Sequence, residues 1–340
     1  MDLTNLKKVL ENEPKFRYKQ IYTAVYRQFV EDWEEASNIP KGLREELKEQ
    51  CPLEIPAEMS VSSDKKTVKA AIHFSRGVVE SVLMRYGKGR NTVCVSTQVG
   101  CAMGCSFCVT GQLGWAGNLS YTEIVQQVLI FERYLKSKGE TVTNVVFMGM
   151  GEPMMNYDQV IRAAKFLNDP DFFNIGARRM SISTVGIPEG IKKLFSQDLQ
   201  INLAVSLNAP SNTVRDSIMP INSKYPLGEL LDTVSEYIER TGREVMMEYI
   251  MLAGVNDSVS QAYKLSRLLK DRLGKHFKVN LIEFNPSQGY KGTSSAGIQR
   301  FRSILEEQGV KVIQRYKFGR DIKAACGQLA GEKGNTPNKK

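Results

Sequence analysis

The stretch Cys101-Ala-Met-Gly-Cys105-Ser-Phe-Cys108 places three cysteines on one short segment, with the spacing C-x₃-C-x₂-C. It follows a strand-like run at residues 93–96, so we expect the cysteines to lie on a loop at the end of a strand. Three thiolates on such a loop can each bind one iron of a [4Fe–4S] cube and leave the fourth iron open to another ligand. The spacing therefore favours an iron–sulfur site with a free coordination position.

Two other uses of these cysteines stay open at this point. A structural zinc site would need a fourth thiolate, which Cys94 or Cys326 could supply. No second Cys-x₂-Cys pair follows in the sequence, and this disfavours zinc. A thioredoxin-like redox pair at Cys105 and Cys108 would leave Cys101 without a role.

Outward from this segment, the chain alternates between strand-like and helix-like stretches. One amphipathic helix is expected to begin at Ser120, with Thr122 and Glu123 as further N-terminal capping candidates. Strands that alternate with helices pair in parallel through right-handed crossovers. We therefore expect an α/β barrel or part-barrel with functional residues in the loops that follow its strands. The expected strands are residues 93–96, 144–148, 180–183, 201–206, 244–251, 278–284 and 310–316.

The chain is expected to divide into four regions. Residues 1–58 are predicted to form a helical accessory domain that binds RNA, because cations and aromatic rings mix in Lys15-Phe-Arg-Tyr-Lys-Gln-Ile-Tyr. A solvated helix face with core tyrosines explains that segment equally well. Residues 59–93 are expected to form a short β connection, residues 94–328 the catalytic barrel, and residues 329–340 a disordered basic tail.

Composition limits the class of protein. Lysine and arginine number 46 against 37 aspartates and glutamates, and the net charge of +9 favours polyanionic partners such as RNA. The sequence has no apolar run long enough to cross a bilayer, and its start lacks the apolar core of a signal peptide. We therefore expect a cytoplasmic protein with no membrane partner, in which six cysteines and only two histidines favour sulfur chemistry over imidazole chemistry.

Further motifs occur in order along the chain, and with the cysteine loop they resemble the RlmN/Cfr family of radical S-adenosylmethionine (SAM) enzymes, which methylate adenosine carbons in RNA. The resemblance covers most of the chain and implies a radical SAM partial (β/α)6 barrel. The motifs are Cys94-Val-Ser-Thr-Gln-Val-Gly-Cys101, Met148-Gly-Met-Gly-Glu-Pro153, Ser183-Thr-Val-Gly, Met219-Pro-Ile-Asn222, Gly254-Val-Asn-Asp257 and Asp321-Ile-Lys-Ala-Ala-Cys-Gly-Gln328.

The resemblance assigns the cofactors to particular residues. It implies that Cys101, Cys105 and Cys108 hold a [4Fe–4S] cluster whose open iron binds the amino and carboxylate groups of SAM. At position 208 the family commonly has histidine, and asparagine can donate a hydrogen bond but cannot titrate or stack as imidazole does. The residues that the resemblance assigns to SAM are Gly151, Glu152, Ser183, Ser206, Leu207, Asn208 and Asn256.

The resemblance also implies two SAM molecules per turnover. Cys326 would be methylated by the first, and a 5′-deoxyadenosyl radical from the second would take hydrogen from the S-methyl group. The carbon radical would add to adenine, and Cys94 would attack the sulfur of Cys326 to release methyladenosine and leave a Cys94–Cys326 disulfide. Glu80 would accept the adenine proton, and an exposed strand carboxylate is the alternative account of this residue.

The favoured product is 2-methyladenosine in 23S rRNA at the peptidyl transferase centre and in tRNA beside the anticodon. We expect a monomer that receives electrons from a donor such as flavodoxin or ferredoxin. Cfr-type methylation at carbon 8 of the same rRNA adenosine is the near alternative, and Gly151-Glu-Pro153 leans toward carbon 2. A non-catalytic zinc or iron–sulfur RNA-binding protein is the distant alternative. Cys51 lies outside every motif and is expected to be a small buried or partly buried residue.

Overall fold

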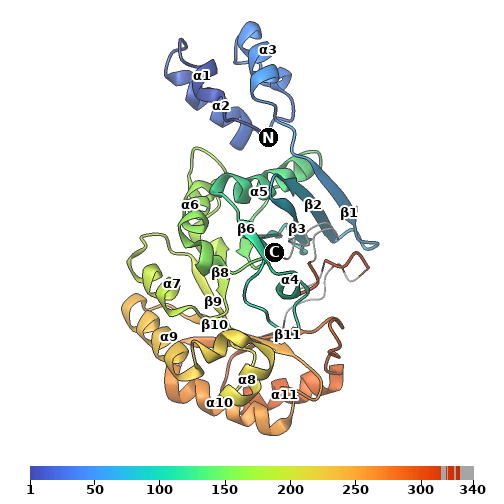
Figure 1. Cartoon of the computed structure of the whole chain (residues 1–340), viewed down its shortest axis with the longest axis vertical. Coiled ribbons are helices and arrows are strands. Elements are labelled where there is room, and N and C mark those ends of the chain that lie inside the picture. Colours follow the sequence, from blue (N-terminus) through green and yellow to red (C-terminus); the bar gives the residue numbers. More distant parts are fainter. Residues whose placement is uncertain (315–318, 320, 325–326, 330–340) are drawn as a thin grey trace, which may run out of the picture.

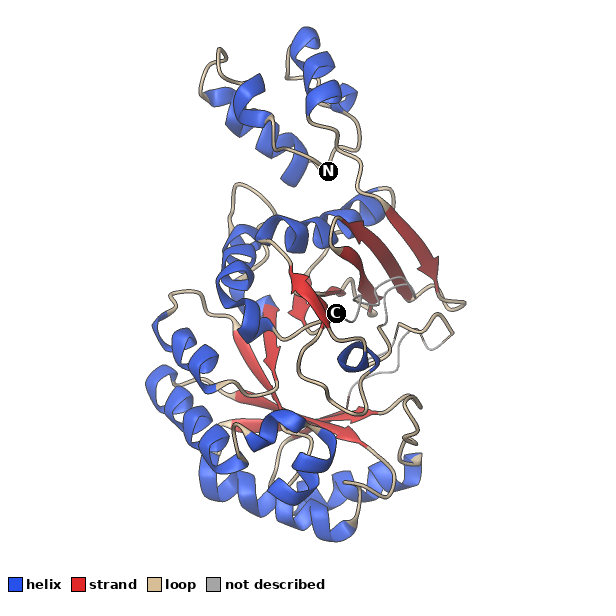
Figure 2. Ribbon diagram, viewed as in Figure 1, coloured by secondary structure: helices blue, strands red, loops and turns tan. Residues whose placement is uncertain are grey.

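The computed structural model describes residues 1–314, 319, 321–324 and 327–329 of the chain. Its centre is a run of parallel strands, each hydrogen-bonded to the next along the sequence (Figures 1 and 2). These strands are β4 (Asn91–Val95), β7 (Asn144–Phe147), β8 (Met180–Thr184), β9 (Asn202–Ser206), β10 (Val245–Met251), β11 (Phe277–Glu283) and β12 (Val312–Gln314). Six of the seven predicted strands are thereby found in place, and the seventh, at residues 310–316, lies partly outside the described residues.

Helices connect successive parallel strands and cover the outer face of the sheet (Figure 2). Among the described residues the sheet runs from β1 to β12, and these two edge strands are not paired with each other, so the barrel is open. The predicted partial (β/α)6 barrel is thereby confirmed. The connecting helices are α5 (Tyr121–Lys136), α6 (Tyr157–Asn168), α7 (Pro188–Lys193), α8 (Asn212–Ile218), α9 (Leu227–Thr241), α10 (Val259–Leu273) and α11 (Ser295–Glu307). In the part of the chain that the structure describes, no helix has the length and apolar character needed to span a membrane.

The sheet continues beyond β4 through three antiparallel strands. These are β3 (Gly77–Arg85), β2 (Thr67–Phe74) and β1 (Ala57–Val61), each paired with the next. Two further strands, β5 (Gln98–Gly100) and β6 (Trp115–Asn118), form a separate ribbon on either side of the cysteine loop and the short helix α4 (Val109–Gln112). This ribbon is not among the strands expected from the sequence.

The N-terminal helices pack on the barrel helices. They are α1 (Leu6–Val9), α2 (Phe16–Tyr26) and α3 (Lys41–Gln50), joined by the 3₁₀ turn η1 (Trp33–Glu35). Tyr22 and Tyr26 of α2 lie 5.7 and 4.8 Å, between ring centroids, from Phe172 and Phe166. Tyr26, which follows the segment of residues 15–22, belongs to the core, and the segment's own Tyr18 and Tyr22 are partly buried and pack against it. This arrangement favours the second interpretation of the segment. Cys51 is fully buried as predicted, and its carbonyl accepts a hydrogen bond from the indole of Trp33.

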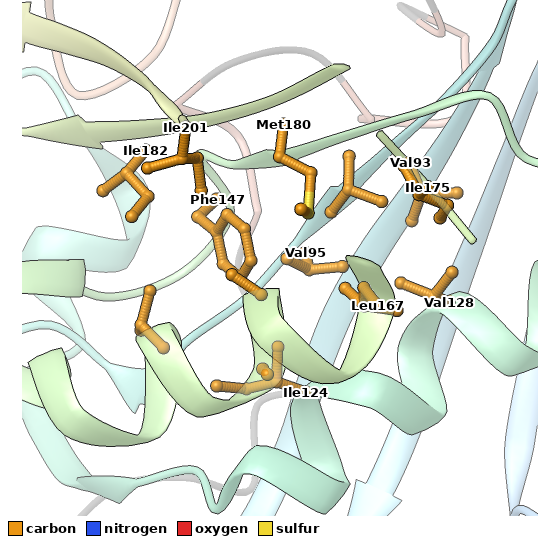
Figure 3. Close-up of a cluster of buried hydrophobic side chains, with 14 of the residues drawn as sticks. Val93, Val95, Ile124, Val128, Phe147, Leu167, Ile175, Met180, Ile182 and Ile201 are labelled. Carbon is orange, nitrogen blue, oxygen red and sulfur yellow. The ribbon is translucent and has the colours of Figure 1, made fainter. Parts of the chain in front are cut away.

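The main core lies between the parallel strands and helices α5 and α6 (Figure 3). Val93 and Val95 of β4 and Phe147 of β7 point toward these helices and are fully buried. The start of α5 has the predicted cap: the Ser120 hydroxyl accepts from the amide of Glu123, and the Glu123 carboxylate accepts from the amide of Ser120. Because alternate residues of a strand point to opposite faces, the neighbouring side chain Cys94 faces the inside of the barrel.

Candidate functional site

The three cysteines of the loop line one cavity of about 130 Å³ at the carboxyl ends of the parallel strands. Gly151 and Glu152 reach it from the loop after β7, and Ser206 and Asn208 from the end of β9. The structure therefore brings together the predicted cluster ligands and four of the predicted SAM contacts: Cys101, Cys105, Cys108, Gly151, Glu152, Ser206 and Asn208.

Backbone hydrogen bonds fix the cysteine loop. The amide of Cys101 donates to the carbonyl of Gly114 at 2.7 Å, and the amide of Ser106 donates to that of Ile218 at 3.0 Å. Gly100 has a φ of 72°, and a Cβ there would lie 2.0 Å from the Gly114 oxygen, so the approach of the two β5–β6 strands requires glycine. The loop is thus held against the ribbon that precedes and follows it.

The chemistry of the donor set fits an iron–sulfur cluster. Burial raises the pKa of the Cys101 thiol to about 12 and also raises that of Cys105, so these groups need a bound cation to become thiolates. Within the described residues, no three histidine, cysteine, aspartate or glutamate side chains converge on the position of one metal ion. Three thiols spread around a cavity suit a cube, which presents its irons at separate corners.

The loop after β7 brings a carboxylate to the cavity wall. At Gly151, which has a φ of 96°, a Cβ would lie 2.5 Å from the Cβ of Gln98, so a side chain has no space here. The buried Glu152 carboxylate accepts hydrogen bonds from the amides of Met154 at 3.0 Å and Val185 at 2.8 Å. Burial nevertheless raises its pKa to about 7. An ammonium group in the cavity would favour the ionised form of this carboxylate.

The end of β9 contributes hydroxyl and amide groups. Ser206 lines the cavity, and its hydroxyl lies 3.5 Å from the hydroxyl of Ser183. Asn208 has a φ of 59°, a left-handed conformation in which asparagine and histidine are both enriched. Its side-chain oxygen accepts from the amide of Ile250 at 3.0 Å, so asparagine anchors this turn to β10.

Two predicted SAM residues support the site from behind. Asn256 is fully buried, and its amide group donates to the carbonyls of Asn208 at 2.8 Å and Ile250 at 2.6 Å. Leu207 is also fully buried, and its carbonyl accepts from Arg215. In the described structure neither residue is among those that line the cavity. Ser183 of β8 does not line the cavity either, so a direct contact of Ser183, Leu207 or Asn256 with SAM stays a prediction.

Arg215 is a residue of the site that the sequence analysis missed. It is fully buried, and its guanidinium donates to the carbonyls of Leu207 at 3.1 Å and Val185 at 2.5 Å and to the side chain of Asn222 at 3.0 Å. Burial lowers its pKa to about 10. Its place shortly before the Met219-Pro-Ile-Asn222 motif was the available signal, but nothing in that motif indicates burial of a cation. Glu248, which also lines the cavity, was missed as well.

Glu80 and Cys94 lie on one face of the sheet. The register places Cys94 opposite Val82, and Glu80 is two residues from Val82 on β3, so the side chains of all three share a face. Glu80 is only 6% exposed and forms an ion pair with Lys69 at 2.7 Å. The exposed-carboxylate account of Glu80 is therefore wrong, because Lys69 of the adjacent strand compensates the charge in a buried position.

The third predicted catalytic residue, Cys326, lies outside the described residues. Residues on both sides of it are described. Asp321 accepts a hydrogen bond from the amide of Ser63, and the carbonyl of Gly327 accepts one from the amide of Val109, which directly follows Cys108.

Comparisons with known proteins cover nearly the whole chain. Residues 95–265 match the radical SAM superfamily, and residues 1–53 match the ribosomal RNA large subunit methyltransferase N-terminal domain. The chain is 44% identical over 323 residues to the probable dual-specificity RNA methyltransferase RlmN 2 of Protochlamydia amoebophila, covering 94% of this chain and 89% of that protein. It is also 44% identical over 326 residues to the ribosomal RNA large subunit methyltransferase N of Nitrosopumilus maritimus, covering 93% and 92% of the two chains.

A solved structure agrees with these sequence relationships. The crystal structure of a radical SAM methyltransferase from Sphaerobacter thermophilus matches with a TM-score of 0.89 and 40% identity over 97% of each chain. The likeness thus includes the N-terminal helices, the barrel and the loop that carries the three cysteines. On these grounds the chain belongs to the RlmN family of radical SAM methyltransferases.

Proposed function

We propose that this protein methylates carbon 2 of adenosine in 23S rRNA and in tRNA. The observation that carries the proposal is the single cavity in which Cys101, Cys105 and Cys108 face Glu152 and Ser206. Two relatives that align over 94% and 96% of this chain are named probable dual-specificity RNA methyltransferases. The net charge of +9 supports a polyanionic substrate.

SAM and a [4Fe–4S] cluster are the cofactors of radical SAM enzymes. The three cysteine thiolates would hold three irons of the cluster, and Glu152 would bind the amino group of SAM. Ser183, Ser206 and the polar groups around Asn208 would hold the rest of that molecule. When bound, the cluster supplies the electron that cleaves SAM to a 5′-deoxyadenosyl radical. We propose that two SAM molecules are used per turnover, one as methyl donor and one as radical source.

The chain itself would carry and release the methyl group. Cys326 takes the methyl group on its sulfur and presents it to the adenine. The S-methyl group would lose a hydrogen atom to the 5′-deoxyadenosyl radical and bond through its carbon to the adenine, and the odd electron of this adduct would leave to the cluster. Cys94, on the inner face of β4, would then attack the sulfur of Cys326: the disulfide forms as the bond from that sulfur to the transferred carbon breaks, and this carbon takes up a proton. Glu80 takes the adenine proton, and its ion pair with Lys69 holds the carboxylate in one orientation on the same face as Cys94.

The N-terminal region is proposed to supply part of the RNA surface. Residues 1–30 contain six lysines and arginines against three acidic residues, whereas residues 31–58 contain three against nine. The excess of cations therefore lies in the part of the chain that carries α1 and α2, whereas the excess of acids in residues 31–58 lies mostly outside α3, which has three cations and three acids. Residues 1–58 as a whole are therefore not basic, and the cations that could contact RNA gather in residues 1–30.

The proposal also covers the division of the chain into regions, its location and its electron donor. We propose that residues 59–93 connect the accessory domain of residues 1–58 to a catalytic barrel of residues 94–328, followed by a basic tail at 329–340. The protein would act in the cytoplasm as a monomer and take electrons from a flavodoxin-like or ferredoxin-like donor.

Product analysis tests the proposal. Protein with reconstituted cluster, SAM, reductant and either a 23S rRNA fragment or tRNA would be incubated without air, and the RNA digested to nucleosides. Mass spectrometry against nucleoside standards should find 2-methyladenosine from both RNAs. The 8-methyl isomer would instead assign the chain to carbon 8. Unmodified RNA, with SAM cleaved, would contradict the assigned substrates.

A further inference from the structure

We propose that the β5–β6 ribbon and the groove beside it bind the single-stranded RNA that flanks the target adenosine, with Trp115 as a stacking platform for one base. The inference rests on the proposed function, since it names the surface on which that RNA substrate would lie.

The ribbon connects this surface directly to the cysteine loop. Trp115 follows Gly114, whose carbonyl accepts a hydrogen bond from the amide of Cys101. The side chain of Gln98 on β5 accepts from the amide of Glu152 in the cavity wall at 2.9 Å and donates to Asn118 on β6 at 2.7 Å. The ribbon thus contacts the cavity wall through its own residue Gln98, so RNA bound on the ribbon would lie beside the cavity in which the cluster and SAM would be held.

A β-bulge directs Trp115 toward this side. The register pairs Gln98 with Asn118 and Gly100 with Trp115, which leaves Ala116 as an extra residue on β6. Because Gln98 and Gly100 share a face of β5, Asn118 and Trp115 share the corresponding face of β6. The indole is 50% exposed on that face.

The adjoining groove has a volume of about 420 Å³ and is lined by Arg76, Asn118, Met155 and Asp158, among others. Arg76 donates to the carbonyl of Asn118, so its guanidinium lies at the ribbon. The Met155 side chain is 52% exposed. A cation, amide groups and exposed apolar side chains are the groups that bind phosphate, base edges and base faces of an unpaired strand.

The charges around the groove favour a polyanion. Arg162 lies 3.7 Å from the ring centroid of Tyr121, whose amide donates to the groove residue Gln159. Lys193 lies 5.3 Å from the ring centroid of Tyr157, another groove residue. With Arg76 these make three cations at or next to the groove, against two acids: Asp158 in the lining and Glu123, whose carboxylate accepts from the lining residue Ser120.

The chemistry requires unpaired RNA at this position. An enzyme that reacts with a ring carbon of a base must take that base out of the stack, which unpairs and unstacks its neighbours. A half-exposed indole beside the catalytic loop can replace one lost stacking partner. Duplex RNA offers no exposed base face to it, so the surface should prefer single strands.

Intrinsic fluorescence provides a direct binding test. The chain has two tryptophans, and Trp33 is buried, so Trp115 is the one that RNA can reach. The full chain would be titrated with a single-stranded decanucleotide of RNA and with the corresponding duplex. The single strand should quench the wild type but not Trp115→Phe, in which only Trp33 remains. Trp115→Ala should raise Kd for the single strand roughly 10-fold, as for loss of one base stack, and Trp115→Phe should raise it much less.

Matched controls separate a local effect from loss of folding. Tyr263 on α10 is 46% exposed and outside the groove, so Tyr263→Ala should leave Kd unchanged. Arg76→Ala should reduce the slope of log Kd against log salt by about 1, as for one lost phosphate contact, whereas Arg267→Ala on α10 should not change it.

Several outcomes would overturn the inference. An unquenched indole, an unchanged Kd in Trp115→Ala, or equal binding of single strand and duplex would each do so. None of these readouts depends on methylation. If RNA quenches Trp115 but no methyladenosine forms, the proposed function fails and this RNA surface stands. If methyladenosine forms but RNA does not quench Trp115, the proposed function stands and this RNA surface fails.

Discussion

Each of the three loop cysteines occupies a position that a different side chain cannot fill chemically. Their thiols line one cavity, and burial disfavours the thiolate form of Cys101 and Cys105 unless a cation is present. Binding of iron would therefore release protons and compensate the buried charge at the same time. Loss of one ligand leaves both an iron without its thiolate and the remaining ligands less ionised.

We expect each of Cys101→Ala, Cys105→Ala and Cys108→Ala to lose most of the iron and all methyl transfer to RNA, because a loop of three ligands has none to spare. Iron content and absorbance near ~400 nm after anaerobic reconstitution measure the effect. Cys51→Ala is the matched control, since Cys51 is buried among the N-terminal helices. The protein with this substitution should keep its full iron content. Full iron and activity in any of the three loop variants would contradict the cluster assignment.

Cys94 and Cys326 should fail in different ways, because the proposed mechanism uses them at different steps. Cys326→Ala removes the methyl carrier, so neither a methylated cysteine nor a protein–RNA adduct should form. Cys94→Ala keeps the carrier but lacks the thiol that releases the product, so RNA should stay covalently attached. A denaturing gel with nuclease treatment distinguishes the two, and mass spectrometry locates the adduct. Identical, unshifted behaviour of both variants would remove both cysteines from the mechanism.

At the scale of elements, α5 joins the accessory helices to the barrel. One side of the helix packs on the parallel strands (Figure 3). On another side, Arg133 donates to the carbonyls of Val30 and Leu53, and Lys136 forms an ion pair with Glu35 at 2.9 Å. The N-terminal helices are therefore attached through a barrel helix whose own start is capped by Ser120, so the two regions share one packed element.

Glu132 on α5 should make stability depend on pH. Burial raises its pKa from the ordinary 4.5 to about 7, even though the Thr141 hydroxyl donates to it. The folded state thus binds this proton more tightly than the unfolded state. The stabilising contribution of the protonated form is complete below pH 4.5 and is lost as pH rises through about 7.

Glu132→Gln keeps a neutral acceptor for Thr141 at every pH. We expect it to change stability little at pH 5 and to raise the free energy of unfolding by about 1–3 kcal/mol at pH 8, relative to the wild type. Denaturant unfolding at the two pH values measures this difference. The same substitution at the exposed Glu239 should have no pH-dependent effect. Equal effects at both pH values would show that Glu132 is not the group that makes stability depend on pH.

The elements differ in how well the sequence predicted them. Strands β7 to β11 and the cap at Ser120 follow from local patterns of β-prone residues and capping groups, and these patterns also decide the local structure. The β5–β6 ribbon was missed because its strands have three and four residues, contain glycine and are interrupted by a bulge, so no alternating pattern arises. Its position depends on tertiary hydrogen bonds through Gln98.

The site was predictable where a motif names the chemistry and not where tertiary packing decides it. The cysteine spacing and the Gly151-Glu152 pair indicated the cavity correctly, because these residues directly follow strands. Burial of Arg215 and the ion pair of Glu80 with Lys69 depend on which segments meet in space. A charged residue in a sequence is expected to be exposed, so only the fold could show that Arg215, Glu80 and Lys69 are not.

At the scale of the whole molecule, charge is distributed unevenly. The accessory helices α1 and α2 are cationic, the segment of residues 31–58 is acidic, and Arg76, Arg162 and Lys193 lie at or near the groove beside the β5–β6 ribbon. An RNA that reaches the cavity can therefore contact the barrel through the groove and use α1 and α2 as a second site. Phosphate contacts at two separated sites add to the salt dependence of binding.

Binding of tRNA should accordingly weaken steeply with salt. Each phosphate contact contributes roughly 0.7–0.9 to the slope of log Kd against log salt, so Lys7→Ala, Lys8→Ala and Lys15→Ala together should lower that slope by about 2–3. These three lysines are exposed on the cationic half of the accessory region. Lys41 is equally exposed but lies in the acidic half, where it pairs with Glu45, so Lys41→Ala should leave the slope unchanged. Since single-stranded decanucleotides would occupy only the groove, the triple variant should bind them as the wild type does. An unchanged slope in the triple variant, or an equal loss of slope in Lys41→Ala, would contradict the second site on α1 and α2 and leave the groove as the RNA contact. A salt-independent Kd for tRNA would contradict phosphate contacts at both sites.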